Sequence, residues 1–392
     1  MVICVLADDF TGAAEIAGVA FRYGLVAEVQ TEYHNAKGAD LICLDNDSRS
    51  CTSQEAVRRV AEAAEQYRRA GVEVFYKKVD SVLRGRITAE LAAMIDVLGK
   101  KRALLVPANP TLGRVIHQGT YLVGGQPLHQ THFALDPEYP IDTSDVREIL
   151  EKTGSDTVHV LAAGKELPQS GIVLGEAGSS GDVAAWARRL DGETIPAGAA
   201  EFFAAYLERM GFEPKKDPVV SGDCLPGART LFVCGSTSDS SRAFCRRCEE
   251  VGLPVLRMPS NLFDVDCQAD PLIEEWSRGA VLALKRDDRA MVAIDRPLRH
   301  DPGLPQRLSY HLADVVRRVL EQIEVDCIFA EGGATAAALA RRLGWKRMIV
   351  RQEWQPGVVS LQPQSAKGLL LTMKPGSYPW PDQFLTTASR SE

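Results

Sequence analysis

Short apolar runs alternate with amphipathic segments along most of the chain. In the first half, runs of strand length occupy residues 2–7, 41–44, 72–77 and 103–107, and segments with helical periodicity occupy residues 13–23, 53–70 and 87–98. Strands that alternate with helices are typical of a parallel sheet covered by helices on both faces. The pattern therefore predicts an α/β fold.

The rest of the chain continues this arrangement with two interruptions. Residues 113–141 are rich in Gly, His and Pro and predict an irregular or β-hairpin insertion. Residues 211–227 contain three prolines and three glycines without periodicity, which is typical of a linker. Further strands are predicted at residues 158–162, 172–174, 229–234 and 327–330, and further helices at residues 182–190 and 336–343.

Length and pattern together predict two domains. A chain of 392 residues exceeds what one hydrophobic core usually supports. We expect one domain at residues 1–212, a linker at residues 213–227 and a second domain at residues 228–392. Each domain is expected to be a mostly parallel sheet with helices on both faces.

Composition and charge narrow the class of protein. Hydrophobic residues make up 45% and charged residues 25% of the chain, which is ordinary for a soluble globular protein. The formal net charge of −7 disfavours nucleic acid and membrane surfaces as partners. No apolar run is long enough to span a membrane, and the N-terminus lacks the basic segment of a signal peptide. The oligomeric state stays open, with a homodimer as the candidate.

The cysteines predict a reducing environment and no zinc site. There are nine, an odd number, and most lie within apolar stretches, so we expect a cytoplasmic protein. Cys245 and Cys248 form a CxxC pair, but no second CxxC and no histidine at ligand spacing accompany them. No residue is therefore predicted as a metal ligand.

The first predicted strand ends on two adjacent carboxylates, Asp8 and Asp9, and Thr11-Gly12 then opens a helix. In open α/β sheets, ligands bind where strand carboxyl ends meet helix N-termini. Two acids at that place can activate a hydroxyl or hold a metal-bound phosphate. An aspartate before a helix is also a favoured N-cap, which would explain one of the two acids. We predict a site here and leave open which aspartate caps the helix.

Two further polar clusters follow predicted strands. Arg49 closes the segment Asp-Asn-Asp-Ser-Arg and can bind a carboxylate bidentately, although a surface loop explains it equally well. Residues 77–85, Lys-Lys-Val-Asp-Ser-Val-Leu-Arg-Gly, combine cations, an acid and a hydroxyl. This combination suits an anionic, polyhydroxylated ligand, because a solvated charge run usually lacks such turn chemistry.

Small-residue loops lie between strands and helices in the second half. Residues 235–241 read Gly-Ser-Thr-Ser-Asp-Ser-Ser, and residues 331–335 read Glu-Gly-Gly-Ala-Thr. Small residues leave backbone N–H groups free, and a helix N-terminus adds partial positive charge that favours phosphate. Neither loop is a P-loop or a GxGxxG motif, and each alone is a weak signal. Phosphoryl transfer needs groups that neutralise charge on the donor phosphates, as these loops could, and groups that orient and deprotonate the acceptor, as the acids and cations of the first half could.

With these motifs the sequence resembles the four-carbon acid sugar kinase family. The family's opening motif, (A or D)DDxTGA, is similar to residues 7–13, and its KxDSxLRG motif is similar to residues 78–85. Its PAxPxxGR segment and the conserved positions after it resemble residues 107–137. Its SGSxS and GGxTA loops resemble residues 234–238 and 332–336. The resemblance keeps its order over nearly the whole chain.

The resemblance implies an ATP-dependent kinase that phosphorylates the terminal hydroxyl of a small sugar acid, such as threonate, erythronate or 3-oxo-tetronate. The N-terminal domain would hold the acid through Arg49, Lys78, Ser81 and Arg84, with Asp8, Asp9 or Asp80 as general base. The C-terminal domain would bind ATP, with Mg²⁺ on its phosphates, through Ser236, Ser238, Gly332, Gly333, Thr335 and Gly376.

Two positions depart from the family pattern. Ala334 stands where the family loop carries an acid, and Pro375 stands where a backbone N–H would be wanted. These departures leave a second hypothesis, a catalytically inactive sensor of sugar acid or nucleotide. A dinucleotide-dependent oxidoreductase is less favoured, because Asp8 and Asp9 stand where a Rossmann fingerprint would place glycines.

Overall fold

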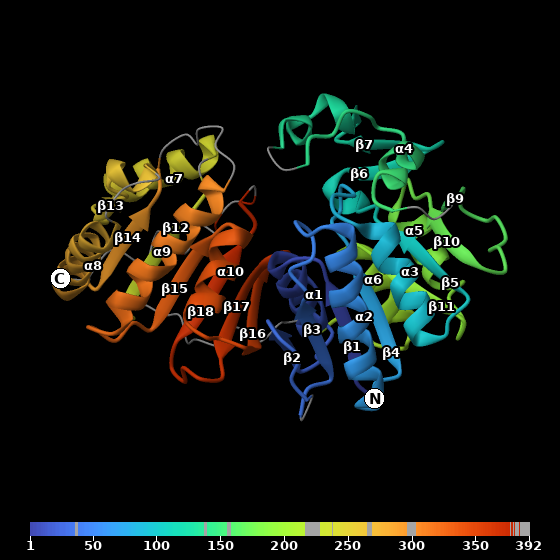
Figure 1. Cartoon of the computed structure of the whole chain (residues 1–392), viewed down its shortest axis with the longest axis horizontal. Helices are drawn as coiled ribbons and strands as arrows, with labels where there is room; N and C mark the ends of the chain where they lie inside the picture. Colours follow the sequence, from blue (N-terminus) through green and yellow to red (C-terminus); the bar gives the residue numbers. More distant parts are fainter. Residues whose placement is uncertain are drawn as a thin grey trace. The chain divides into compact units, whose positions relative to one another are not determined.

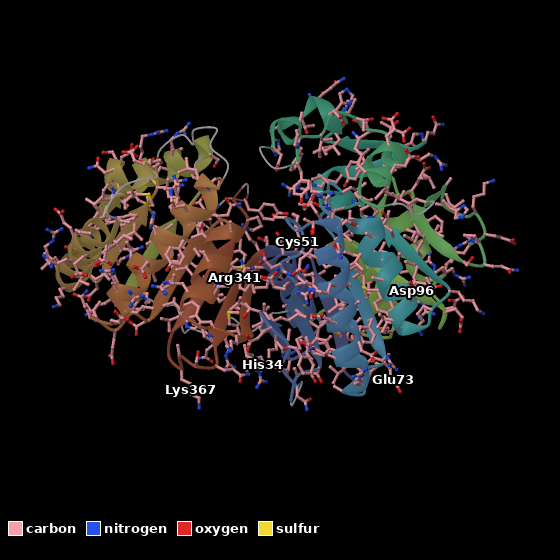
Figure 2. The ribbon with its side chains drawn as sticks, viewed as in Figure 1. His34, Cys51, Glu73, Asp96, Arg341 and Lys367 are labelled. Carbon is pink, nitrogen blue, oxygen red and sulfur yellow. The ribbon has the colours of Figure 1, made fainter. Side chains whose placement is uncertain are left out.

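The computed structural model divides into two compact units, Met1–Lys216 and Asp217–Glu392, which we call unit 1 and unit 2 (Figure 1). Charged side chains such as Glu73, Asp96 and Lys367 lie exposed on the surface of their own unit (Figure 2). Of the predicted linker, residues 216–227 lie outside the described residues. The structure describes residues 1–35, 38–136, 139–154, 158–215, 228–236, 238–264, 269–295, 303–376, 378, 380 and 384.

Unit 1 is built on a parallel sheet whose strands, apart from one partly exposed edge strand, are buried on both sides, as continuous apolar runs predict. The chain leaves β1 (Ile3–Ala7) toward β2 (Ala27–Gln30) and β3 (Leu41–Asp45) and then crosses back to β4 (Val74–Lys78), so the strand order reverses at β1. The order across the sheet is β2, β3, β1, β4, β11 (Thr194–Gly198), β5 (Arg102–Val106), β10 (Gly171–Gly175) and β9 (Val158–Leu161).

Helices cover both faces of this sheet (Figure 1). On one face, Tyr67 and Met94 pack into a core with Cys4 and Leu6 of β1. That face carries α2 (Ser53–Arg69), α3 (Ile87–Leu98) and α4 (Val146–Glu151). Because side chains alternate along a strand, Val5 points to the opposite face. The opposite face carries α1 (Phe10–Arg22), α5 (Ser180–Ala187) and α6 (Ala200–Arg209).

A small antiparallel sheet occupies the insertion predicted at residues 113–141, and the hairpin expectation there is confirmed. Gln118 and Gly119 both have positive φ, as do Gly124 and Gly125. Two-residue loops with two positive φ values match the twist of a hairpin. The strands are β6 (Arg114–His117), β7 (Thr120–Val123) and β8 (Gln126–Pro127).

Unit 2 carries a mostly parallel sheet in which β17 runs antiparallel to its neighbours. The order is β13 (Val255–Arg257), β14 (Arg289–Ala293), β12 (Thr230–Cys234), β15 (Cys327–Glu331), β18 (Leu370–Lys374), β17 (Val358–Pro363) and β16 (Arg347–Gln355). On one face α7 (Asp239–Glu250) packs on Phe232 and Phe329. The other helices are α8 (Ala269–Asp287), α9 (Leu304–Leu320) and α10 (Gly333–Arg342), which contact one another in that order.

The expected α/β architecture of two sheets with helices is confirmed, and the strands and helices named from the pattern are found close to their predicted positions. The sequence pattern did not name the strands β11, β13, β14, β16, β17 and β18 or the helices α4, α6, α8 and α9. It also missed β2, because its Glu28 and Gln30 interrupt the apolar run. These two side chains are buried and hydrogen-bonded to each other at 2.6 Å, and the Tyr67 hydroxyl donates to Gln30 at 2.5 Å. Among the described residues, no helix is long and apolar enough to cross a membrane.

Candidate active site

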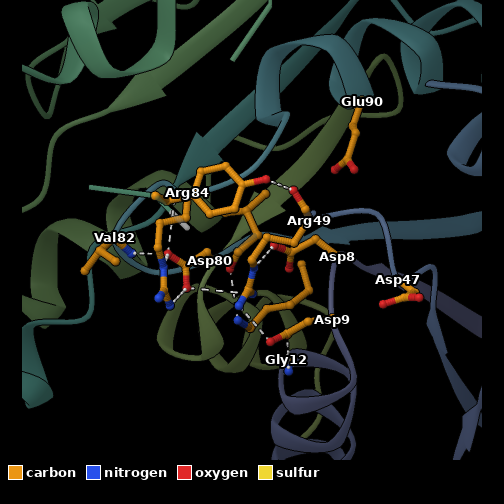
Figure 3. Close-up of polar contacts among 12 residues, drawn as sticks. Asp8, Asp9, Gly12, Asp47, Arg49, Asp80, Val82, Arg84 and Glu90 are labelled. Atoms are coloured by element: carbon orange, nitrogen blue, oxygen red, sulfur yellow. Dashed lines mark hydrogen bonds and ion pairs between the residues drawn. The ribbon is translucent and has the colours of Figure 1, made fainter. Parts of the chain in front are cut away.

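The carboxyl ends of three neighbouring strands bring the predicted acid-binding residues of unit 1 together. In the sheet register, Ala7 of β1 lies beside Asp45 of β3 and beside Lys78 of β4. The segments that follow these strands therefore meet at one edge of the sheet (Figure 3). The strand order reverses at β1, and such a reversal is where ligands bind in open α/β sheets.

Arg49 joins the three aspartates of this cluster. Its Nε lies 2.7 Å from Asp8 Oδ2, and its Nη1 lies 2.8 Å from Asp9 Oδ2 (Figure 3). Its Nη2 lies 3.7 Å from Asp80 Oδ1. The Tyr139 hydroxyl donates to the Arg49 carbonyl, which anchors the loop. Arg49 thus offsets the repulsion among carboxylates that the fold holds close together.

Asp80 is held by its own loop and by Arg84. Its Oδ2 accepts hydrogen bonds from the backbone N–H groups of Val82 and Arg84, both at 3.2 Å. The Arg84 guanidinium donates to both Asp80 oxygens at 2.8 Å and lies 2.7 Å from Asp136 Oδ2. Burial raises the pKa of Asp80, but Arg84 and Arg49 outweigh it and hold that pKa far below its usual range. Asp80 is therefore a firmly ionised carboxylate.

The loop after Asp80 contains strained backbone. Leu83 is buried and has a φ of 66°, in the left-handed region that costs a non-glycine residue about 1–3 kcal/mol. Its N–H donates to the Asp80 carbonyl at 3.1 Å. The hydrogen bonds to Asp80 maintain this conformation, and strain of this kind is found mostly at ligand-binding loops.

Asp9 is the aspartate that caps α1. Its Oδ1 accepts a hydrogen bond from the Gly12 N–H at 2.7 Å. A Cβ at Gly12 would lie 2.9 Å from Asp9 Oδ1 and 3.1 Å from Lys78 Cγ, so the motif requires glycine there. The Asp8 side chain is only 4% exposed, against 25% for Asp9. Asp8 Oδ1 is buried and has no hydrogen-bond partner among the residues described.

The two adjacent aspartates differ in acidity. Burial opposes the ionisation of Asp8, but Arg49, Lys77 and Lys78 outweigh it and lower its pKa. Burial raises the pKa of Asp9, and the charge of Asp8 adds to this effect, although Arg49 acts in the opposite direction. Environments that separate the pKa values of neighbouring carboxyls are how active sites divide acid and base roles.

The two lysines of β4 point to opposite faces of the sheet, as alternation along a strand requires. Lys78 Nζ lies 3.3 Å from Glu15 Oε2 of α1 and donates to the Val79 carbonyl at 2.9 Å. Lys77 Nζ lies 2.9 Å from Glu90 Oε2 of α3, and both side chains are fully buried. Sequence reasoning did not find Glu15 or Glu90, because only the packing of helix on strand brings them to the lysines.

The small sheet supplies further residues that sequence reasoning gave no role. Ser81 Oγ accepts a hydrogen bond from Arg114 of β6, and the Ser81 carbonyl accepts one from the Tyr121 hydroxyl of β7. Asp136, which binds Arg84, follows the same small sheet. Arg114, Tyr121 and Asp136 lie within the segment that resembles the family, which was the signal available for them.

In unit 2, the predicted phosphate-binding loops follow three adjacent strands. The register places Cys234 of β12 beside Glu331 of β15, and Glu331 beside Lys374 of β18. The loops at 235–238, 332–335 and 375–376 therefore begin side by side. A Cβ on Gly235 would lie 1.9 Å from Thr335 Oγ1, and one on Gly376 would lie 3.4 Å from Ser236 Oγ. The structure thus brings the predicted nucleotide-binding residues into one place.

Two helix N-termini point into this place. Ser238 caps α7 by accepting from the Ser241 N–H at 3.2 Å, and Ser236 donates to Ser238 at 3.2 Å. Gly332 precedes α10 with a φ of 98°, and no side chain of the described residues caps that helix. The first N–H groups of α10, from Gly333 onward, are therefore available to an anion such as phosphate.

Glu331 is a buried carboxylate at the centre of these loops that sequence reasoning left without a role. Its Oε1 lies 2.9 Å from Lys374 Nζ and accepts a hydrogen bond from Ser241 at 2.5 Å. Its Oε2 accepts from Trp380 Nε1 at 3.3 Å and from the Cys234 thiol at 3.6 Å. These bonds tie α7, β12, β15 and β18 to one another behind the loops.

A known domain family matches each unit of the chain. A sugar-binding N-terminal domain matches residues 3–191, and a nucleotide-binding C-terminal domain matches residues 231–378. A D-threonate kinase of Cupriavidus necator is 30% identical over 382 residues, which are 90% of this chain and 88% of that kinase. This chain belongs to the four-carbon acid sugar kinase family. The expected family is thereby confirmed, as is the expected enzyme class, a phosphotransferase with an alcohol group as acceptor.

Other members of the family are similar over comparable lengths. A D-threonate kinase of Salmonella typhimurium is 27% identical over 390 residues, covering 91% of this chain and 90% of the relative. A D-erythronate kinase of Heliobacterium modesticaldum is 27% identical over 390 residues, covering 90% and 88%. These relatives are named as kinases and give no support to the sensor or the oxidoreductase hypothesis.

Solved structures confirm the fold. A Haemophilus influenzae protein of the DUF1537 family superposes with a TM-score of 0.73 over 98% of both chains, at 20% identity. A protein of Salmonella typhimurium LT2 superposes with a TM-score of 0.78 over 99% of this chain and 98% of that one, also at 20% identity. The α/β architecture of this family is therefore the architecture of the present chain.

Proposed function

We propose that this protein transfers the terminal phosphate of ATP to the terminal hydroxyl of a four-carbon sugar acid, with D-threonate and D-erythronate as the first candidates. Relatives named for these two acids match about nine-tenths of the chain. The observation that carries the proposal is the cluster of Asp8, Asp9 and Asp80 around Arg49 at the strand reversal of unit 1. Guanidinium groups can bind the carboxylate of a sugar acid, and carboxylates can accept hydrogen bonds from its hydroxyl groups.

Asp9 is the best candidate for the general base. A base must hold a pKa that lets it accept a proton in the reaction, and it must reach the reacting hydroxyl. Asp80 accepts two hydrogen bonds from the Arg84 guanidinium and two from backbone N–H groups, and its strongly lowered pKa makes it a weak base. Asp9 has one bond on each oxygen, from a backbone N–H of α1 and from Arg49. Asp8 also has a lowered pKa, whereas that of Asp9 is raised and its side chain is the more exposed.

The remaining residues of the cluster would bind and orient the acid. Asp8 Oδ1, buried and without a partner in the described structure, fits a hydrogen bond from a substrate hydroxyl. A buried carboxylate oxygen without a hydrogen bond destabilises the protein. A substrate hydroxyl that donates to Asp8 Oδ1 would remove this cost. Arg49 binds Asp8 directly, and Lys78, Ser81 and Arg84 lie at and after the end of the neighbouring strand β4. Their hydrogen bonds and charge would hold the acid.

Unit 2 would bind ATP at the loops after β12, β15 and β18. The open N–H groups at the start of α10 and the small residues of the loops suit the phosphates. This assigns the sugar-acid-binding role to residues 1–212 and the nucleotide-binding role to residues 228–392. The proposed nucleotide-binding residues are Ser236, Ser238, Gly332, Gly333, Thr335 and Gly376.

Mg²⁺ would accompany the nucleotide. Within the described ranges, no group of three or more His, Cys, Asp or Glu side chains is arranged to hold a metal ion. A magnesium ion carried by ATP phosphates needs few protein ligands and keeps several waters. The Ser236 and Ser238 hydroxyls beside the loops are oxygen donors of the kind that it accepts. When bound, the ion neutralises charge on the phosphates that are transferred.

The compartment that fits this chemistry is the cytoplasm, where ATP is abundant. Buried cysteines such as Cys4 and Cys43 are thiols rather than disulfides, as a reducing compartment allows. Whether the enzyme acts as a homodimer is tested by its mass in solution.

The proposed function is tested by ADP release from ATP and Mg²⁺ across a panel of acids with three to five carbons. The panel includes both stereoisomers of threonate and erythronate and the 3-oxo-tetronates. We expect one four-carbon acid to have the highest kcat/KM and its phosphate to sit on the terminal hydroxyl, as NMR of the product would show. ADP release with none of the acids would overturn the proposal.

A further inference from the structure

Arg114 differs from the other cations of the acid cluster. Arg49, Lys78 and Arg84 each lie within 4 Å of at least one carboxylate oxygen. Arg114 Nη1 instead donates to the hydroxyl of Ser81, which is neutral. Across the ranges that the structure covers, no carboxylate lies at ion-pair distance from Arg114. Among the described residues, its positive charge therefore has no carboxylate partner.

The position of Arg114 is fixed by its backbone. Its N–H donates to the Asn109 carbonyl at 3.1 Å, and its own carbonyl accepts from the Asn109 N–H at 2.8 Å. Its Cζ lies 5.6 Å from the centre of the Phe133 ring. A guanidinium on an aromatic face keeps most of its five N–H donors available at its edge. Arg114 is thus preorganised to accept a planar anion.

A second guanidinium shares the same ring. Arg84 Cζ lies 5.8 Å from the centre of Phe133. Two cations against one ring repel each other. Asp80 and Asp136 lie at ion-pair distance from Arg84, and no described ion pair joins either of them to Arg114. An anion bound at Arg114 would balance the remaining charge. Since Ser81 directly follows Asp80 in the chain, that anion would lie next to the aspartate cluster.

We propose that Arg114 binds the carboxylate of the sugar acid, with the Ser81 hydroxyl beside it and Phe133 as its platform. Arg114 would then select acids over neutral polyols of the same length. Arg49 and Arg84, which form ion pairs with the aspartates, would hold those aspartates in position to accept hydrogen bonds from the substrate's hydroxyl groups. The identity of the ligand rests on the proposed function, whereas the site itself rests on the Arg114 guanidinium, which has no ion-pair partner in the part of the chain that the structure describes.

The experiment compares Arg114→Gln and Arg114→Lys with Arg147→Gln. Arg147 is an exposed arginine of α4 that lies outside the cluster, so its loss controls for the removal of one positive charge. Two measurements are made on the full chain. Steady-state kinetics give KM for the preferred four-carbon acid and KM for ATP. Calorimetry gives the affinity for that acid and for the matching neutral tetritol, and does not depend on turnover.

Arg114→Gln is expected to weaken acid binding about 10- to 100-fold, because a charge-assisted bidentate contact is lost. KM for ATP and tetritol binding stay unchanged. Arg114→Lys retains the charge and is expected to recover part of the loss, and Arg147→Gln behaves like the unmodified enzyme. Recovery by lysine also shows that the loss in Arg114→Gln is not a folding defect.

The outcomes separate this inference from the proposed function. If the unmodified enzyme turns over a four-carbon acid and Arg114→Gln binds it equally well, the role of Arg114 is wrong and the proposed function stands. If the unmodified enzyme binds the acid without turnover and Arg114→Gln loses that binding, the proposed function is wrong and the role of Arg114 stands. If no acid binds at all, both are wrong.

Discussion

Glu331 Oε1 lies 2.9 Å from Lys374 Nζ, and both side chains are almost fully buried at the ends of adjacent strands. Gly332 follows Glu331, and the segment Pro375-Gly376 follows Lys374, so the ion pair lies directly behind two of the proposed phosphate loops. The Gly332 N–H also donates to the Lys374 carbonyl at 3.1 Å. The pair therefore couples the stability of unit 2 to the geometry of the nucleotide loops.

Replacing Lys374 by Met should destabilise unit 2 by about 3–5 kcal/mol, because it leaves a buried carboxylate without its counterion. The double variant Glu331→Gln with Lys374→Met should lose less than the sum of the single losses. Urea unfolding followed by tryptophan fluorescence measures this, because unit 2 contains Trp276, Trp345, Trp354 and Trp380.

The matched control is Lys367→Met, which removes an exposed lysine of the same unit. Surface substitutions of this kind usually change stability by less than about 0.5 kcal/mol. Equal unfolding midpoints for Lys374→Met and Lys367→Met would show that the buried pair does not stabilise unit 2.

Asp9→Asn should lower kcat about 10²- to 10⁴-fold, the usual contribution of a general base, and leave KM for ATP unchanged. Asp80→Asn should act mainly on KM for the acid, because Asp80 orders Arg84 and Arg49. Both values come from the ADP-release assay with the preferred acid. Wild-type turnover in both variants would refute the assignment of the base to this cluster.

The acid limb of the pH–rate profile should report Asp9. A base works when ionised, and burial together with Asp8 raises the pKa of Asp9 above the ordinary aspartate value of about 3.9. Activity should therefore fall at a pH higher than an unperturbed aspartate predicts. The residual activity of Asp9→Asn should lack this limb, and an unchanged limb in that variant would assign it to another group.

The folding stability of the protein should also depend on pH through Asp80, because the ionised form of Asp80 is the one that its arginine partners stabilise. Its folded-state pKa lies below the unfolded value, so its contribution is fully present above about pH 3.9 and is lost as the pH falls below it. Asp80→Asn should therefore be less stable than the unmodified protein at pH 7, with a difference that shrinks toward pH 3. Urea midpoints across this range measure it, and a constant difference would contradict the ion pairs of Asp80.

Gly235→Ala should raise KM for ATP at least about 10-fold, a change worth 1.4 kcal/mol. The new Cβ would lie 1.9 Å from Thr335 Oγ1, so the loops after β12 and β15 must move apart. KM for the acid should stay constant. Gly192→Ala is the control, because a Cβ there meets nothing within 4 Å, and equal KM values for ATP in the two variants would contradict the loop assignment.

The order of strands and helices could be predicted because periodicity is a local property of the chain. The apolar run before Asp8 and the spacing of the Asp80-Ser81 motif predicted both the strand ends and the polar clusters that follow them. The pattern left several elements unnamed, among them β11, β14 and the helices α6, α8 and α9. At β2 the physical reason is clear: Glu28 and Gln30 read as exposed polar residues in the sequence, but they are buried and hydrogen-bonded to each other. A buried polar pair of this kind is recognised only when the structure shows that the two side chains are buried and bonded to each other.

By itself the sequence determined the α/β class, the family and the residue types of both loop sets, because these depend on local patterns and on motif order. Only the tertiary structure decided that Asp9 caps α1, that Lys77 pairs with Glu90, and that Arg114 contacts no acid among the described residues. The physical reason is that charge compensation and pKa depend on distances between residues far apart in the chain. Strand register sets those distances, and no local pattern encodes them.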